Sequence, residues 1–428
     1  MNIIYFVLLD SKLVVYSSLD SEFEMWPKED PFTTPSPLQN NVQFRWTRSN
    51  RSLRLSGLRV TPSRIVILLL LCGCLIMSRR WLPKVVVVTL EQYIEPEPGI
   101  YNATSVPQAA FQPPESIPYR MPDSIDSFAN YKYRNTCNVS SLDLHAPFSP
   151  LCSDRPSMLA AMSGGGRIGF DSPYMPRGCD MRWYTSEEIC DIFSKFEKVI
   201  LIGDSMLRHM MGSFNIFVRK DIGYGAVTDW NFSPQERKEC FCNEQFDVKA
   251  CSVQGIYKTA DVVDHDPGSV SCGAPVNVMM EQIVRFPSPD DELFRLREDL
   301  LSHPTSKPIA VVFGHGLWSD LDLQRTLNWL DALIAQIDST VGRSKWQGIF
   351  VTPNAAGKEK PDEWIVSQGN KALMLYEESV GIEVGKRELE HLGTWNMSIQ
   401  SRKYDGVHLD MKGNLVKAMM VMNWLAML

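Results

Sequence analysis

The sequence predicts an α/β fold with a mostly parallel sheet, because short apolar segments alternate with longer amphipathic ones. Residues 198–203 form the first apolar segment, and 307–313 and 347–352 form two more. Their length and continuous apolar character are typical of strands buried on both faces. With 428 residues, 44% of them hydrophobic, and a net charge of -7, the chain is globular, and its acidity disfavours nucleic-acid binding.

Helices are predicted between and after these strands. Met, Leu and Phe fall on one face of 206–220, and leucines recur at helical spacing through 320–338. The cysteine-rich stretch 221–290 interrupts the alternation, and we interpret it as a loop-rich insertion. The remaining predicted elements are a helix at 361–380, a short strand at 382–384 and a C-terminal helix at 411–428.

The first 130 residues differ in composition from the rest. Residues 20–64 are rich in Ser, Pro and Arg, so we expect 1–64 to be a disordered cytoplasmic tail. Residues 65–77 are apolar, and the arginines beside them lengthen the effective span, so 65–90 is interpreted as an uncleaved signal anchor. A buried helix in a soluble protein is the alternative. The prolines of 91–130 predict a semi-rigid stem, and 131–428 is the expected globular domain.

The basic residues and cysteines indicate where this domain resides. An excess of arginine before the apolar segment predicts a single-pass type II topology, with the domain in the lumen of the Golgi or ER. Eight cysteines follow the apolar segment, which favours disulfides whose pairing is left open. A zinc site at Cys240-Phe-Cys242 is the alternative, although its spacing is unusual for zinc. Glycosylation sequons, which fit a lumenal domain, occur at Asn102, Asn138, Asn231 and Asn396.

The first predicted strand ends in Gly203-Asp204-Ser205, directly before a helix. Ligands of open α/β sheets bind at the carboxyl ends of the strands. Backbone N–H groups at the start of a helix can stabilise an oxyanion, so Ser205 is a candidate nucleophile. A simple Ser/Asp helix cap is the alternative interpretation.

A serine nucleophile needs a general base, because its hydroxyl is weak at neutral pH. Of the seven histidines, only His408 has an Asp three positions earlier, in Asp405-Gly406-Val407-His408. On a turn before the last helix, this spacing allows Asp405 to orient the imidazole while His408 removes the Ser205 proton. A surface turn is the alternative, since Asp-Gly is a common turn dipeptide.

These motifs resemble those of the SGNH (GDSL-like) hydrolase superfamily. The match is to its PC-esterase branch, which includes trichome-birefringence-like polysaccharide O-acetyltransferases and the lumenal domains of sialate O-acetyltransferases. In that branch Gly-Asp-Ser lies early in the domain and Asp-x-x-His near its end, and Arg208 matches a common arginine. The resemblance covers about residues 195–428. It implies a three-layer α/β/α sandwich and a reaction that needs no metal or other cofactor.

The resemblance also implies three donors to the oxyanion: the serine N–H, a glycine N–H and an asparagine. Gly225 is the expected glycine, with Gly223 as a close rival. The asparagine position falls on Gly314, and His315 beside it is a candidate substitute donor, with a satisfied structural histidine as the alternative because a buried strand precedes it. Loss of one donor can cost about 3 kcal/mol of transition-state stabilisation.

The expected function is acyl transfer from an ester, through an acyl-Ser205 intermediate, to water or to a sugar hydroxyl. The resemblance implies glycans as substrates and acetyl as the acyl group. It also implies, for a transferase, a membrane partner that supplies acetyl groups. The alternative is a catalytically inactive lumenal domain that binds glycans or acts as a scaffold.

Overall fold

The computed structural model describes residues 4–9, 12–17, 126–148, 150–167, 172–273 and 276–428. The chain divides into two units, Met1–Gln108 and Ala109–Leu428. In the first unit, β1 (Ile4–Leu9) and β2 (Lys12–Ser17) pair as an antiparallel hairpin. Residues 20–64, on which the prediction of a disordered tail rests, lie outside the described residues.

The predicted signal anchor at 65–90 and the stem up to residue 125 lie outside the described residues. Within the part of the chain that the structure describes, no helix has the length and apolar character needed to cross a membrane.

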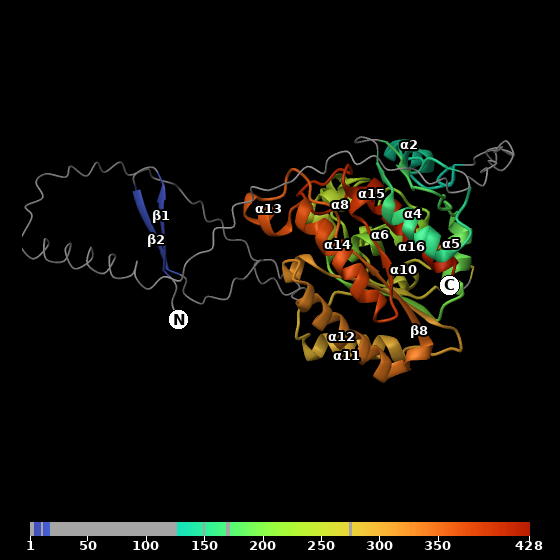
Figure 1. The fold of residues 1–428 in the computed structure, drawn as a ribbon. Helices are drawn as coiled ribbons and strands as arrows, with labels where there is room; N and C mark the ends of the chain where they lie inside the picture. The colour runs from blue at the N-terminus through green and yellow to red at the C-terminus, as the bar shows by residue number, and fades with distance from the viewer. Residues whose placement is uncertain (1–3, 10–11, 18–125, 149, 168–171, 274–275) are drawn as a thin grey trace, which may run out of the picture. The chain divides into compact units, whose positions relative to one another are not determined.

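A five-stranded parallel sheet is the centre of the second unit (Figure 1). Every neighbouring pair in this sheet runs parallel, with Gly203 opposite Gly314 where two strands end. The predicted α/β class with a parallel sheet is therefore confirmed. In spatial order the strands are β6 (Val278–Glu281), β5 (Lys198–Gly203), β7 (Ile309–Gly314), β8 (Trp346–Val351) and β9 (Glu390–Leu392).

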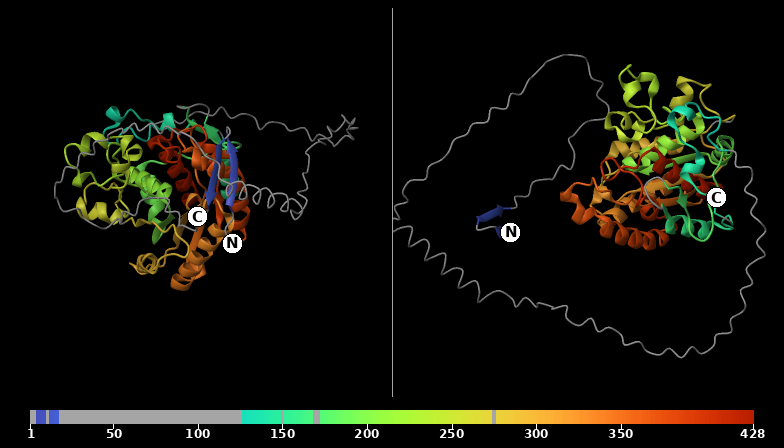
Figure 2. Two further views of the ribbon diagram at one scale, coloured as in Figure 1. Left: turned by 90° about the vertical axis from the view of Figure 1, so that its left-hand side faces the viewer. Right: turned by 90° about the horizontal axis from the view of Figure 1, so that it is seen from above.

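Side chains alternate along β5 between two hydrophobic cores. Val199 and Leu201 belong to one core, and Ile200 and Ile202 to the other. Because both faces are buried, the strand reads as one continuous apolar segment. The first core includes α4 (Arg155–Gly164), α5 (Ser186–Ser194), α6 (Ser205–Arg219) and α16 (Met411–Ala426). The second includes α11 (Asp290–Leu301), α12 (Leu323–Val341) and α14 (Asn370–Gly385) (Figures 1 and 2).

Two predicted elements differ from the structure, and one observed strand was not predicted. The strand expected at 382–384 lies inside α14, and the fifth strand is β9. The helix expected at 361–380 is broken into α13 (Asp362–Gln368) and α14 by Gly369, whose backbone is extended. A Cβ at Gly369 would lie 2.1 Å from the carbonyl oxygen of Ile365, so only glycine fits there. Strand β6 lies inside the predicted insertion and was not expected.

Short elements fill the rest of the second unit. Before β5 lie α2 (Arg134–Cys137), α3 (Ser141–Leu144), β3 (Gly166–Arg167) and β4 (Tyr174–Met175). The insertion consists of η1 (Asp229–Asn231), α7 (Glu236–Glu239), α8 (Glu244–Asp247), α9 (Lys249–Ser252) and α10 (Thr259–His265). Later in the chain come η2 (Leu317–Ser319), η3 (Arg343–Lys345) and α15 (Trp395–Ser398).

The eight cysteines of the second unit form four disulfides, as predicted. The pairs are Cys137–Cys242, Cys152–Cys179, Cys190–Cys272 and Cys240–Cys251. Cys240 and Cys242 are therefore each bonded to another sulfur, and the zinc alternative for this pair is wrong. Cys72 and Cys74 lie outside the described residues.

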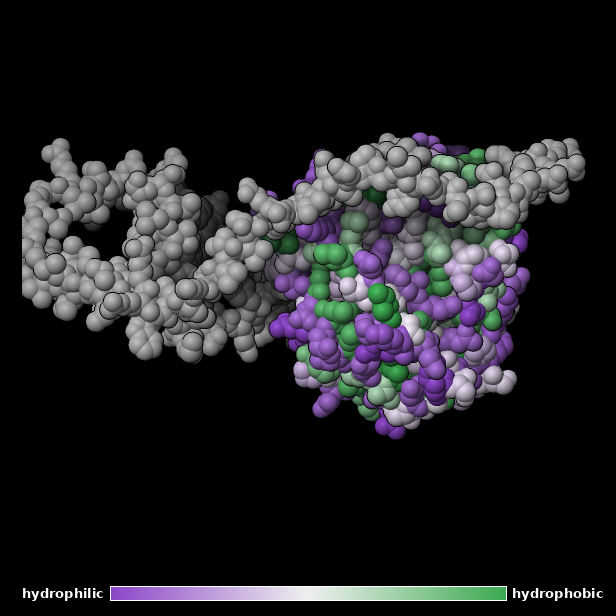
Figure 3. Space-filling model, viewed as in Figure 1, coloured by the Kyte–Doolittle hydropathy of each residue, from purple (hydrophilic) through white to green (hydrophobic). Residues whose placement is uncertain are grey.

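Apolar side chains gather on one face of the domain, over α14 (Figure 3). The exposed apolar residues of α13 and α14 are Ile365, Val366, Met374, Leu375 and Ile382. Isolated exposed apolar residues are common on proteins, but a group of this kind is less so.

Candidate active site

Ser205 is the first residue of α6 and follows β5 directly. The Asp204 side chain caps the helix by accepting a hydrogen bond from the Met206 N–H at 3.0 Å. Gly203 permits the tight approach of β5 and β7, since a Cβ there would lie 2.0 Å from the Gly314 carbonyl oxygen. The hydroxyl of Ser205 is thus held at the carboxyl edge of the sheet, where the sequence predicts it.

His408 lies on the loop before α16, 203 positions after Ser205. The Nε2 atom of His408 is 2.6 Å from the Ser205 hydroxyl oxygen. This is a hydrogen-bonding distance, and it is the contact that a serine nucleophile needs with its general base. The structure thus brings together two residues that the sequence linked only by motif.

Asp405 completes the array from the other side of the imidazole. Its Oδ2 atom is 2.6 Å from Nδ1 of His408, and its Oδ1 atom accepts the N–H groups of Val407 and His408. Nδ1–H therefore donates to the carboxylate, which leaves Nε2 free to accept the Ser205 proton. Burial alone would raise the pKa of Asp405, but the hydrogen bonds from His408 and from the two backbone N–H groups lower it below its ordinary value.

Gly406 makes the turn between Asp405 and His408 possible. Its φ angle is +77°, a conformation that glycine adopts without strain. A Cβ at this position would lie 2.1 Å from the Lys360 backbone nitrogen. The Asp-Gly pair is thus a turn, as in the alternative interpretation, and the same turn carries both polar side chains of the array.

The structure does not bring Gly225 to the nucleophile. Its N–H donates to the Asp221 carbonyl at 3.1 Å, and the residue packs against Ile216 in the last turns of α6. Eleven residues of helix separate Ile216 from Ser205, which is about 16 Å along the axis. The rival Gly223 donates its N–H to the Asp221 carboxylate. Both assignments as oxyanion donors are corrected, because their donors are used at the far end of the helix.

Gly314 and His315 have different surroundings, although they are adjacent. Gly314 ends β7 and lies against Leu207, in the first turn of the nucleophile helix. The His315 ring instead donates from Nε2 to the Val284 carbonyl at 3.0 Å and stacks on Trp329. Burial lowers the pKa of His315 to about 4. His315 is therefore a neutral, satisfied core histidine, and its assignment as a substitute oxyanion donor is corrected.

Arg208 lies one turn after Ser205 and faces a polar cluster that sequence reasoning missed. Its Nη1 donates to Gln282 Oε1 at 3.2 Å, and the Tyr257 hydroxyl donates to the same oxygen. Its Nε is buried and has no hydrogen-bond partner among the described residues. Gly255 lies against its aliphatic stem. Gln282 directly follows β6, so only a prediction of that strand could have located this cluster.

Two aromatic rings flank His408. The centroid of His209 lies 4.9 Å from that of His408, and Tyr404 lies nearly parallel to His408 at 6.0 Å. Burial, with the nearby His408 and Arg208, holds the pKa of His209 well below its ordinary value. His209 is therefore neutral. Tyr404 stacks on the His408 ring.

A cavity of about 760 Å³ begins at Tyr404. Its walls carry both signs of charge, including Arg402, Lys412 and Glu244, and the disulfide of Cys137 and Cys242 closes one side. Tyr404 lines this cavity and also stacks on His408, so one ring separates the cavity from the imidazole, and neither Ser205 nor His408 lines it.

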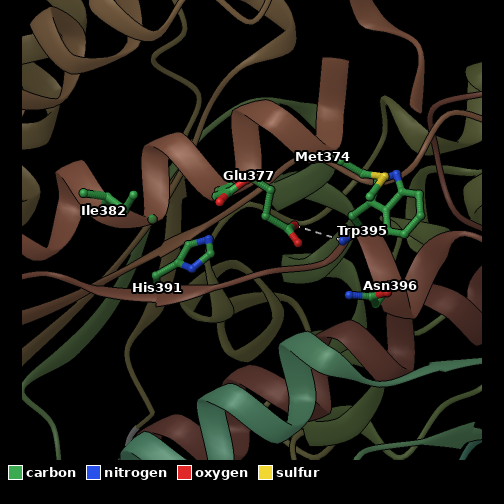
Figure 4. Close-up of a pocket in the computed structure, with 8 residues that line it drawn as sticks. Met374, Glu377, Ile382, His391, Trp395 and Asn396 are labelled. Carbon is green, nitrogen blue, oxygen red and sulfur yellow. Dashed lines mark hydrogen bonds between the residues drawn. The ribbon is translucent and has the colours of Figure 1, made fainter. Parts of the chain in front are cut away.

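A second cavity, of about 500 Å³, lies between α14, β9 and α15 (Figure 4). Glu377 points toward α15, where its carboxylate accepts the N–H groups of Thr394 and Trp395. The His391 ring packs against Gly381. Among the described contacts, neither the His391 ring nor the Trp395 ring makes a hydrogen bond to Glu377. The same carboxylate accepts a hydrogen bond from the Thr352 hydroxyl, so Glu377 holds a turn together.

Within the described residues, no group of three or more His, Cys, Asp or Glu side chains is arranged to hold a metal ion. Comparison of the chain with protein-family models, with curated proteins and with solved structures gave no match.

Proposed function

We propose that the chain is an acyl-ester hydrolase or acyltransferase that works through an acyl-Ser205 intermediate. The hydrogen-bonded array of Ser205, His408 and Asp405 carries the proposal, with contacts of 2.6 Å on both sides of the imidazole. Helices packed against both faces of the parallel sheet support the three-layer α/β/α sandwich that the SGNH resemblance implies.

In the proposed reaction, the Ser205 hydroxyl oxygen attacks the ester carbonyl while His408 Nε2 takes its proton. The imidazolium formed is stabilised by Asp405, and it then protonates the leaving alcohol. Water or another hydroxyl next attacks the acyl-serine, again with His408 as the base. This step releases the acid or the new ester and restores Ser205.

The developing oxyanion needs donors other than Gly225 and His315. At the start of α6 the backbone N–H groups of Met206, Leu207 and Arg208 are bonded to Asp204. The Ser205 N–H and the positive end of the helix dipole are therefore the donors that the helix itself offers to the carbonyl bonded to Ser205. Arg208, whose Nε is buried without a partner among the described residues, is the side chain closest in sequence that can add a charged donor. These groups replace Gly225 and His315 in the proposal.

Glycan O-acetyl groups remain the proposed substrates, on the resemblance alone. A cavity of about 760 Å³ beside Tyr404 has room for a sugar unit, and its charged walls can hydrogen-bond to hydroxyls. Four disulfides support an oxidising compartment and thus a lumenal domain in the Golgi or ER. A transferase reaction would need a membrane partner that supplies acetyl groups.

One observation favours a second candidate function, a catalytically inactive domain that binds glycans or acts as a scaffold. The glycine donor that the resemblance implies, Gly225, and the candidate substitute for the missing asparagine, His315, are both engaged in structural hydrogen bonds. An enzyme left with too few donors would stabilise the transition state poorly, since each donor contributes about 3 kcal/mol.

Labelling with a fluorophosphonate probe separates the two functions. We expect the full chain in detergent to be labelled at Ser205 and the Ser205→Ala variant to be unlabelled. Absence of labelling in a folded wild-type chain would support the inactive domain. Hydrolysis of an acetylated glycan, with and without an acceptor sugar, then distinguishes hydrolase from transferase.

A further inference from the structure

Lys417 is a buried charge in the helix behind the proposed active site. It lies in α16, which packs along α6, and its side chain is only 1% exposed. Lysine is almost never buried to this extent unless its ammonium group has partners. Neither the proposed reaction nor the family resemblance gives this residue a role.

The partner of Lys417 leads directly to the catalytic turn. Its ammonium donates to Asn354 Oδ1 at 3.0 Å, in the segment that follows β8. The amide nitrogen of Asn354 donates in turn to the Val407 carbonyl at 3.3 Å. Val407 precedes His408, and its own N–H is held by Asp405. The turn that carries His408 is therefore attached to α16 through Asn354.

Lys417 also interacts electrostatically with Asp204, the residue before Ser205. Burial lowers the pKa of Lys417 to about 8, while Asp204 and Glu377 counteract that effect. Asp204 is itself buried beside Ser205, and its Oδ2 has no hydrogen-bond partner among the described residues. Burial raises the pKa of Asp204, and Lys417 is the first charged group that opposes this rise.

We propose that Lys417 is a positioning residue for the Ser205–His408 pair. Through Asn354 it fixes the turn that presents the imidazole, and its charge compensates the Asp204 carboxylate that caps the serine helix. This inference rests on the proposed function for its kinetic consequence. Its structural consequence, a fixed His408 ring, does not depend on turnover.

The test compares Lys417→Met, which keeps the length of the side chain and removes the charge, with wild type. We expect kcat for ester hydrolysis to fall roughly 10-fold or more with KM little changed, because small displacements near reacting atoms can cost up to about 100-fold. We also expect the far-downfield proton resonance of His408 Nδ1–H to shift or disappear. That resonance reads the geometry of the array even in a chain without turnover.

Lys198→Met is the matched control. Lys198 is also 1% exposed and donates to the carbonyls of Asp299 and Leu300, but it lies at the opposite end of β5 from Ser205. This variant is expected to lower thermal stability and to leave both kcat and the His408 resonance unchanged. An equal effect of the two substitutions would overturn the proposal, because burial of any lysine would then explain it.

Asn354→Ala provides the second variant in case Lys417→Met does not fold. It removes the link to Val407 and leaves the lysine in place, so the His408 resonance should again move. An unchanged resonance and unchanged kcat in this variant would overturn the proposal. Failure of the proposed function is a separate result: wild type would show the resonance but no labelling by the fluorophosphonate probe.

Discussion

Each side chain of the proposed catalytic array has little reactivity on its own. The three groups are the Ser205 hydroxyl, the His408 imidazole and the Asp405 carboxylate. Contacts of 2.6 Å on both sides of the imidazole join the three groups, and in the proposed reaction they act as one unit. Groups that act as a unit show strongly non-additive effects when they are removed. This property provides a sharper test of the site than the loss of activity in any one variant.

The first prediction concerns that unit. Ser205→Ala and His408→Ala should each remove nearly all acyl-ester turnover, and the double variant should be little worse than either. Asp405→Asn should cost less than removal of His408, because it disturbs tautomer and orientation but keeps the base. Turnover of a chromogenic acetyl ester measures this, with circular dichroism as the folding control. Full additivity of the two alanine variants would argue against a shared mechanism.

A second prediction at this scale concerns the glycosylation sequons. Asn138 is exposed after α2, whereas the Asn396 side chain is half-buried and donates to the Ser163 carbonyl at 2.9 Å. A lumenal domain should therefore carry a glycan at Asn138 and none at Asn396. The Asn138→Gln variant should lose a glycosidase-sensitive shift in gel mobility, and Asn396→Gln should not. A glycan at Asn396 would contradict the packing around that residue.

Sequence motifs located the Ser205–His408 pair that the structure brings together, but they did not locate free hydrogen-bond donors beside it. Ser205 and His408 are each tied to a local pattern, a strand end and a turn before a helix. Gly225 and His315 were assigned through the resemblance, by their places after the first helix and after the second buried strand. Whether a glycine N–H or a histidine ring is free depends on partners such as Asp221 and Val284, and a single sequence does not reveal those partners.

Elements with one clear hydrophobic pattern along their whole length were predicted well. Short or interrupted elements were not. Strand β5 matches its predicted range because every residue in it is buried. Strand β6 has only four residues and contains Val-Met-Met-Glu, of which Met and Glu favour helices, so its pattern is weak. Strand β9 is three residues long and follows a helix whose apolar residues continued past the predicted end.

The third prediction concerns the connection of α14 to α15. Glu377 accepts two backbone N–H groups there, so Glu377→Ala leaves buried donors unpaired and should destabilise the domain by about 2–3 kcal/mol. Glu378→Ala, on the exposed side of the same cavity, should have almost no effect. Thermal unfolding measures both. Loss of fluorophosphonate labelling in a folded Glu377→Ala chain would show that this cavity belongs to the reaction instead.

At the scale of the whole molecule, pH acts on stability through buried neutral histidines. Burial lowers the pKa of His315 and His391 to about 4 and holds that of His209 well below its ordinary value. Between about pH 6.5 and 4 the unfolded chain therefore binds more protons than the folded chain, and stability falls as the pH falls. Glu281 and Asp247, whose pKa values burial raises to about 7 and about 6, act in the opposite direction.

The fourth prediction isolates the contribution of one histidine, because further buried carboxyls, among them Asp204, Asp221 and Asp410, also have raised pKa values and oppose the histidines. Chemical denaturation of wild type and of His391→Gln is compared at pH 6.5 and at pH 4.5. The variant should lose less stability, or gain more, than wild type as the pH falls, because one fewer proton is taken up on unfolding. The His391 Nε2 atom has no hydrogen-bond partner among the described residues, so this substitution removes no such contact. An unchanged pH dependence in this variant would contradict the assignment.

The disulfide loops enclose the proposed nucleophile, Ser205, but not the proposed base, His408. Cys137–Cys242 and Cys190–Cys272 overlap in sequence, and both enclose Ser205, while His408 lies more than a hundred residues beyond the last bridged cysteine. A protease that cut once between 138 and 271 would leave a single covalent molecule, separable only after reduction. A cut between 273 and 404 would instead divide nucleophile from base. The two pieces would then stay together only as a non-covalent complementation pair, through the packing of α16 on α6.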